Sequence, residues 1–229
     1  MSTLLLRLAA PLQSWGDDSK FSTRRTYEIP TKSGVIGLLA AALGRARNES
    51  NIDLVNLRMG IRVDQPGALL DDFQIVRWKE DKTEKSEVTK RYYLSDAVFL
   101  VGMEFQDKVF LEKLQDALFH PVYPLFLGRR SCPPSYPLVL GIRNCSLREA
   151  LEQEPWLVQE WRQKRLSGKL RLVLENDGEG TAVLHRLRDV PVSFNPERRE
   201  YQYRYIQEGG YVERSREQET EHDAFGELG

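Results

Sequence analysis

Most of the chain alternates short apolar runs with longer stretches whose apolar residues recur at helical spacing. A short apolar run bounded by turn residues is typical of a buried strand, and apolar residues three or four positions apart are typical of a helix. This pattern predicts strands over residues 3–13, 59–64, 97–105 and 169–176, and helices over residues 31–47 and 107–119. The order strand, helix, strand, strand, helix, strand is that of the ferredoxin-like split βαβ unit, with helices on one face of an antiparallel sheet.

Further β-rich runs predict two additions to this unit. Residues 73–78 and 88–94 are joined by the polar segment KEDKTEKSE, which predicts an inserted β-hairpin at about 73–96. Near the C-terminus, the runs TAVLHRL, VPVSF and EYQYRYI predict a small antiparallel sheet. The predicted fold is therefore α+β, with a ferredoxin-like domain over residues 1–178 and a small β region over 179–212.

Charge is unevenly distributed along the chain. The 229 residues carry 33 basic and 34 acidic side chains, a formal net charge of −1. Residues 213–229 have a net charge of −4, so the remainder has a net charge of +3. The charged end predicts a disordered or solvated tail, and the basic remainder is compatible with a nucleic-acid partner.

Composition gives little support to membrane or metal chemistry. No window approaches the roughly 20 apolar residues of a membrane span, and the N-terminus lacks a signal-peptide pattern. We therefore expect a cytoplasmic protein without a membrane partner. The two cysteines, Cys132 and Cys145, form no C-x-x-C pair, so neither a disulfide framework nor a metal site is expected, and no cofactor is indicated.

The start of the first predicted helix has features of an anion site. Thr31 is a good N-cap, and Lys32, Ser33 and Gly34 follow it, where backbone N–H groups lack intrahelical partners and attract negative charge. The alternative is a capped core helix whose glycines aid packing. From this stretch alone the core helix is favoured, and the glycine and lysine spacing of a P-loop is absent upstream.

A second candidate anion site lies in the proline-rich segment 120–137, which predicts a rigid, irregular loop. It contains Gly128, Arg129, Arg130 and Ser131. Guanidinium groups bind phosphate in a forked geometry, and a glycine permits turns that aim backbone N–H groups at an anion. The alternative is an arginine pair that holds the loop through carboxylates.

Aromatic side chains beside cations indicate single-stranded nucleic acid. Trp15, next to Gly16, could stack on a base, although a tryptophan at a strand end more often covers the core. On the predicted hairpin, Arg77, Trp78 and Arg91 combine cations with a stacking surface. These loops and the hairpin arm could lie on one edge of an RNA-binding fold.

Catalytic patterns are sparse. The chain has three histidines, His120, His185 and His222. A metal-independent ribonuclease needs a base, an acid and a cation around one phosphate, and His120 with Tyr123 and Arg129 or Arg130 is the local set that could attempt this. A structural histidine is the favoured interpretation.

Four long segments resemble one known family. They are PLQSWG (11–16), FSTRRTYEIPTKSGVIGLLAAALGR (21–45), FLGRRSCPP (126–134) and DVPVSFNPERREYQYR (189–204). Together they closely resemble the fifth family of CRISPR-associated proteins in its Cascade subtype I-E form. The resemblance covers nearly the whole chain, in order.

The resemblance implies a repeat-associated (RAMP) protein that caps the 5′ handle of the crRNA in the Cascade surveillance complex. It also implies that a hairpin thumb, here residues 73–96, folds over the junction of handle and spacer. The implied partners are the crRNA, the Cascade backbone subunit and the large subunit, with target DNA entering through the assembled complex. In this family form a separate endoribonuclease processes the RNA, so a non-catalytic role is expected.

A sister branch, subtype I-C, cuts pre-crRNA with a tyrosine, a lysine and a histidine. None of the three histidines here follows a lysine, and this departure from the sister branch argues against cleavage. The alternative function is an endoribonuclease of that type, with His120 as acid or base. With the resemblance, the anion-site interpretation of the helix start becomes the favoured one. The residues expected to bind RNA are Gln13, Ser14, Trp15, Gly16, Arg24, Arg25, Lys32, Ser33, Gly34, Arg77, Trp78, Arg91, Gly128, Arg129, Arg130 and Ser131.

Overall fold

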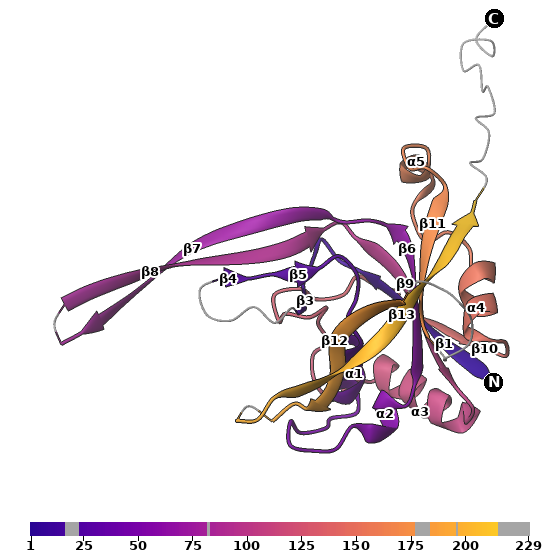
Figure 1. Cartoon of the computed structure of the whole chain (residues 1–229), viewed down its shortest axis with the longest axis horizontal. Helices are drawn as coiled ribbons and strands as arrows, with labels where there is room; N and C mark the ends of the chain where they lie inside the picture. Colours follow the sequence, from indigo (N-terminus) through magenta and orange to yellow (C-terminus); the bar gives the residue numbers. More distant parts are fainter. Residues whose placement is uncertain (17–22, 82, 177–183, 196, 215–229) are drawn as a thin grey trace, which may run out of the picture.

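The computed structural model describes residues 1–16, 23–81, 83–176, 184–195 and 197–214. Its main feature is a seven-stranded antiparallel sheet in the order β10-β1-β9-β6-β11-β13-β12 (Figure 1). The strands are β1 (Ser2–Ala9), β6 (Arg58–Gln65), β9 (Val98–Phe105), β10 (Val139–Arg143), β11 (Lys169–Glu175), β12 (Leu184–Ser193) and β13 (Glu200–Glu213).

Helices cover both faces of this sheet. Along β1, Leu4, Leu6 and Leu8 belong to the larger core cluster, together with residues of α1 (Lys32–Ala42) and α3 (Lys108–Phe119). Leu5 points to the other face and packs in a smaller cluster with α4 (Leu147–Gln153). The alternation follows from strand geometry, in which successive side chains point to opposite faces. Two short helices complete the set, α2 (Ile52–Val55) and α5 (Glu160–Gln163).

A long hairpin extends away from the sheet (Figure 1). It consists of β7 (Ala68–Glu80) and β8 (Thr83–Ser95), paired in register along their length. Near its base, β8 also pairs with β2 (Leu12–Gln13) and, in parallel, with β4 (Thr23–Arg24). A further short pair joins β3 (Trp15–Gly16) to β5 (Thr26–Tyr27). The strands β2 and β4 therefore lie against the base of the hairpin, and β3 and β5 pair with each other close to it.

Two parts of the predicted fold are wrong. The predicted fourth strand, β11, does not lie beside β1, because β10, which the hydrophobic pattern does not reveal, pairs there instead. The C-terminal strands do not form a separate sheet either. The three predicted runs give two long strands, and β13 pairs with β11, so β12 and β13 extend the main sheet.

The first helix agrees with the expected start and differs at its end. Thr31 is the N-cap and its side chain accepts a hydrogen bond from the Gly34 amide, but the helix stops at Ala42 instead of about 47. Most of the predicted tail, residues 215–229, lies outside the described residues. Within the described part of the chain, no helix is long and apolar enough to cross a membrane.

Candidate nucleic-acid interface

Three segments that are far apart in the sequence meet at the start of α1. The Ser14 amide donates a hydrogen bond to the Leu127 carbonyl at 3.2 Å. A Cβ atom at Gly34 would lie 2.8 Å from the Trp15 ring, and one at Gly128 would lie 1.6 Å from the Ser14 carbonyl oxygen. Glycine is therefore required at both positions for the segments to approach so closely.

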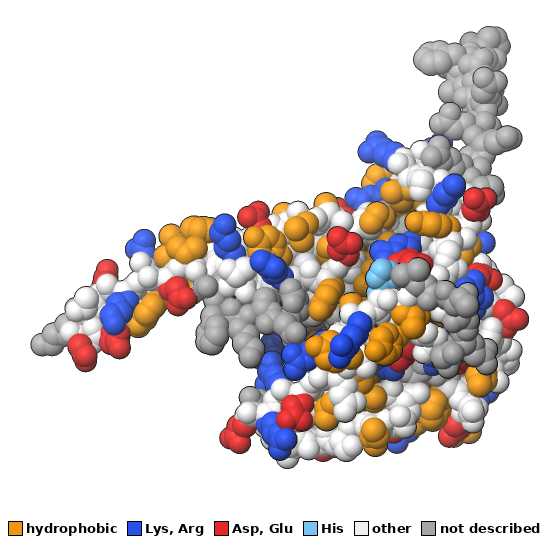
Figure 2. Space-filling view, viewed as in Figure 1, with side chains coloured by type: hydrophobic (Ala, Val, Ile, Leu, Met, Phe, Trp, Pro, Cys, Tyr) orange, Lys and Arg blue, Asp and Glu red, His pale blue; other side chains and the backbone are white. Residues whose placement is uncertain are grey.

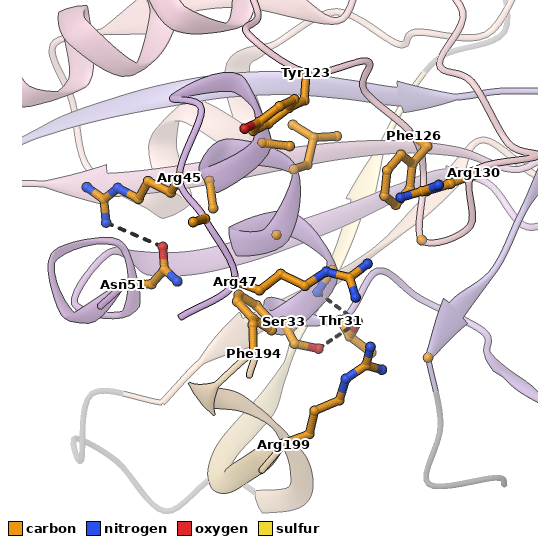
Figure 3. Close-up of a pocket in the computed structure, with 18 of the residues that line it drawn as sticks. Thr31, Ser33, Arg45, Arg47, Asn51, Tyr123, Phe126, Arg130, Phe194 and Arg199 are labelled. Atoms are coloured by element: carbon orange, nitrogen blue, oxygen red, sulfur yellow. Dashed lines mark hydrogen bonds between the residues drawn. The ribbon is translucent and has the colours of Figure 1, made fainter. Parts of the chain in front are cut away.

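Beside this junction is a pocket of about 600 Å³, here called the cradle pocket (Figure 3). Gly16, Ser33, Gly34, Gly128 and Arg130 line it, so the structure brings these five expected residues together. The lining also includes the arginines Arg45, Arg47 and Arg199 and the aromatic residues Tyr123, Phe126, Phe194 and Tyr201. The pocket thus combines guanidinium groups, aromatic rings and exposed backbone.

The arginines of the cradle pocket differ in how far their charge is compensated. Arg45 donates to the Asp53 carboxylate at 2.6 Å, and this hydrogen bond raises the pKa of the guanidinium. No ion pair among the described residues involves Arg47, Arg130 or Arg199. Figure 3 shows the guanidinium groups of Arg47 and Arg199 converging near Thr31 at the helix start. Their positive charge makes the pocket attractive to phosphate.

The two adjacent arginines have different surroundings. Arg130 is exposed and lines the cradle pocket. Arg129 turns away from it: its guanidinium lies 4.6 Å from the centroid of the Tyr93 ring and donates to the Arg24 carbonyl at 3.0 Å. Arg129 therefore holds the loop and the strand β4 against the hairpin base, while Arg130 is available to a ligand.

The prediction that the Lys32 side chain binds phosphate has to be corrected. Its side chain is only 4% exposed, and its ammonium group donates to Glu175 at 2.8 Å. Burial lowers the pKa of this ammonium, although the Glu175 carboxylate opposes the shift. The Lys32 backbone amide donates to the Asp189 carboxylate at 2.8 Å. The anion at the helix start is thus Asp189 of the protein itself.

The side chains of residues 13–15 also point inward, against expectation. Trp15 is fully buried and packs on Gly34, so its ring covers the core. The Gln13 amide donates to the Leu8 and Ala97 carbonyls, and the Ser14 hydroxyl donates to the Tyr92 carbonyl. These side chains position the backbone around Gly16 and are not exposed for stacking on bases or for contacts with sugars.

The expected residues of the hairpin lie outside the cradle pocket. The parallel register places Arg24 beside Arg91 at the hairpin base, close to the loop that Arg129 holds. Farther out, Arg77 and Trp78 are exposed on β7. Figure 2 shows hydrophobic, basic and acidic side chains mixed along the hairpin. Arg25 and Ser131 are exposed but do not line the pocket.

The candidate ribonuclease set is not assembled. His120 caps the end of α3 with its side chain 78% exposed, and its ring faces Asp116 at 3.2 Å. Tyr123 and Arg130 line the cradle pocket, whereas His120 does not. Among the described residues, no group of three histidine, cysteine or acidic side chains is placed to hold a metal ion.

Sequence reasoning missed Arg47, Arg199 and three of the aromatic lining residues, Phe126, Phe194 and Tyr201. Arg199 and Tyr201 lie in the segment 189–204, which carries the family resemblance. The resemblance of this segment could therefore have indicated both residues as site candidates. Arg47 was missed because the predicted helix extended to it, whereas in the structure the helix ends at Ala42 and Arg47 lies in the loop that follows.

Comparisons with known proteins agree on one family. Residues 3–207 match the family described as CRISPR-associated protein (Cas5). The chain is 35% identical over 152 residues to the CRISPR system Cascade subunit CasD of Escherichia coli (strain K12), which covers 58% of this chain and 67% of that protein.

Two solved structures are also similar. One, a chain of a CRISPR RNA-guided surveillance complex, has a TM-score of 0.77 and 33% identity, covering 92% of this chain and 91% of that one. The other, described as a Cas protein, has a TM-score of 0.70 and 42% identity, covering 93% of this chain and 96% of that one. With its mixed fold of helices and antiparallel sheets and a match over nearly its full length, the chain belongs to the Cas5 family of CRISPR-associated proteins.

Proposed function

We propose that this protein is a non-catalytic RNA-binding subunit of a CRISPR surveillance complex and that its cradle pocket holds the 5′ handle of the crRNA. The observation that carries this proposal is the convergence of Arg47, Arg130 and Arg199 on one aromatic-lined pocket. A bent single strand brings several phosphates close together and turns its bases outward. Guanidinium groups suit the phosphates, and aromatic rings suit the bases.

The arrangement of the strands supports this function. The elements β1, α1, β6, β9, α3 and β10 follow the order of the split βαβ unit, and we infer a ferredoxin-like core with β10 as its fourth strand. Related sheets are used by RNA-binding domains. In this interpretation the hairpin β7–β8 is the thumb, and its exposed Phe73, Ile75 and Trp78 contact a neighbouring backbone subunit.

The remaining partners follow from this placement. The large subunit and the backbone subunit flank the bound handle, and target DNA enters through the assembled complex in the cytoplasm. Support comes from the similar chain in an RNA-guided surveillance complex and from the similar Cascade subunit.

Replacing Arg130 by alanine is expected to weaken binding of handle RNA about tenfold, because a charge-assisted hydrogen bond to phosphate is lost. The slope of log K against log salt should fall by about 0.7, the value for one phosphate contact on a single strand. Fluorescence anisotropy with labelled handle RNA over a salt titration measures both quantities.

The matched control is Arg148→Ala on α4, which covers the opposite face of the sheet. It should leave the affinity and the slope unchanged. The double variant Arg129→Ala, Arg130→Ala should bind at least as weakly as Arg130→Ala. An unchanged slope in both Arg130 variants would remove this residue from the phosphate site.

Purified protein is expected to leave repeat RNA intact in the presence of EDTA. His120 is exposed beside Asp116 and does not line the cradle pocket, so among the described residues His120 does not meet the pocket arginines at one phosphate. Gel analysis of labelled repeat RNA checks this. Specific cleavage that His120→Ala abolishes would contradict the non-catalytic role.

A further inference from the structure

The outward face of the C-terminal hairpin, β12–β13, carries two half-exposed tyrosines. On β13, Arg204 and Ile206 are buried toward α1 and the larger core cluster. Tyr203 and Tyr205 alternate with them and therefore point to the opposite side of the sheet, where they are 50% and 52% exposed. Helix α4, which covers this side of the sheet, lies mainly over β1, β6 and β9 and reaches β13 at Gly209, farther along the strand than Tyr203 and Tyr205.

Arginines of β12 lie against these rings. Arg186 is directly opposite Tyr205 in the antiparallel register, and its guanidinium lies 3.6 Å from the centroid of the Tyr203 ring. The Arg188 guanidinium lies 6.0 Å from the same centroid. These four residues, here called the Tyr–Arg face, form a group of stacked cations and rings. Figure 2 shows basic and hydrophobic side chains side by side over this hairpin.

Arg186 gives this face positive charge, and two described acids of the neighbouring strand β13 are paired with other arginines. Glu208 pairs with Arg171 at 2.5 Å, and Glu200 pairs with Arg198 at 2.6 Å. Among the described residues, no ion pair joins Arg186 to a carboxylate. A ligand with negative charge and flat rings therefore fits this surface.

The Tyr–Arg face lies close to the cradle pocket along β13 but on the side of the sheet away from α1, so a strand leaving the pocket reaches it around the sheet edge formed by β12. Tyr201 lines that pocket and precedes Tyr203 by two residues on the same strand. Alternate residues of a strand are about 7 Å apart. The Arg188 guanidinium donates to the Tyr201 carbonyl at 3.4 Å, which links the two surfaces.

We propose that the Tyr–Arg face binds single-stranded RNA that continues from the cradle pocket. Bases stack on Tyr205 and on the guanidinium plane that Arg186 presents over Tyr203, and Arg186 also attracts phosphate. A single strand fits better than a duplex, because the bases of a duplex are already stacked on one another. This inference rests on the proposed function, since the strand must first occupy the cradle pocket.

The test uses the full chain and two labelled oligouridylates, one of about 4 and one of about 16 nucleotides, the range of site sizes for one binding domain. The short probe fills the cradle pocket alone, and the long one reaches the Tyr–Arg face. The double variant Tyr203→Ala, Tyr205→Ala should bind the long probe about tenfold or more weakly, as expected for lost stacking. It should bind the short probe as the unmodified protein does.

Two controls isolate stacking. The variant Tyr203→Phe, Tyr205→Phe keeps the rings and should keep the long-probe affinity. Tyr211→Ala removes an exposed tyrosine at the other end of β13 and should change neither affinity. An equal loss in the phenylalanine variant or in Tyr211→Ala would overturn the inference.

The outcomes also separate this inference from the proposed function. If Arg130→Ala weakens both probes while the tyrosine variants weaken neither, only the Tyr–Arg face is rejected. If Arg130→Ala changes neither probe, the cradle pocket itself is rejected and the inference with it. Loss of co-purifying complex subunits in the alanine variant, with both RNA affinities intact, would make the face a protein interface and also overturn the inference.

Discussion

Replacing Gly128 by alanine is expected to destabilise the protein by roughly 2 to 5 kcal/mol and to weaken RNA binding. Gly128 has φ of +83°, a conformation that costs an alanine about 1 to 2 kcal/mol. Its Cβ would also lie 1.6 Å from the Ser14 carbonyl oxygen, so one of the two backbone segments must move. Arg130 would move with the loop. Urea unfolding and anisotropy with handle RNA measure the two effects.

Two glycines separate backbone strain from the close approach. Gly210 has φ of +87°, but a Cβ added there would meet no atom within 4 Å, so Gly210→Ala should cost only the strain. Gly16 lines the cradle pocket and also has open space, so Gly16→Ala should change the free energy of unfolding by less than about 0.5 kcal/mol. If Gly128→Ala cost no more than Gly210→Ala, the contact between the Ser14 and Gly128 segments would be refuted.

Local sequence patterns found the elements that have strong periodicity. The apolar faces of α1 and α3 and the apolar runs of β1, β6 and β9 were all visible in the sequence. The strand β10 was missed because its sequence, VLGIR, is short and contains a glycine, and its pairing with β1 is a long-range contact. The start of helix α4 could have been predicted from the sequence, because Ser146 and Glu149 form a capping box.

The site was harder to predict because burial and ion pairing depend on distant segments. Lys32 looked like a phosphate ligand, but its partners Glu175 and Asp189 are 143 and 157 positions away in the sequence. Arg129 and Arg130 are equivalent in the sequence, and only the path of the loop after Gly128 separates them. Sequence alone therefore identified the segments of the cradle pocket better than the side chains that face it.

The corrected role of Lys32 connects the hairpin β12–β13 to the start of α1. Asp189 accepts two hydrogen bonds from the Arg204 guanidinium, at 2.7 and 2.8 Å, and one from the Lys32 backbone. Glu175 accepts from the Lys32 ammonium and from the Met59 backbone. The two positive and two negative side chains balance in charge. This network holds the start of β13, which carries Tyr201 and follows Arg199, and both residues line the cradle pocket.

Replacing Asp189 by asparagine is expected to destabilise the protein by about 3 to 5 kcal/mol, because the buried Arg204 guanidinium loses its paired charge. Asp53→Asn, which breaks the more exposed pair with Arg45, should cost less than about 1 kcal/mol. Adding Arg204→Met to Asp189→Asn restores the charge balance of the network. The loss of unfolding free energy in the double variant should therefore be about 1 to 3 kcal/mol smaller than the sum of the losses in Asp189→Asn and Arg204→Met. Urea unfolding of the four proteins of this cycle measures the coupling. Additive losses would mean that Asp189 and Arg204 act independently, and the hairpin would then be held by its strand pairing alone.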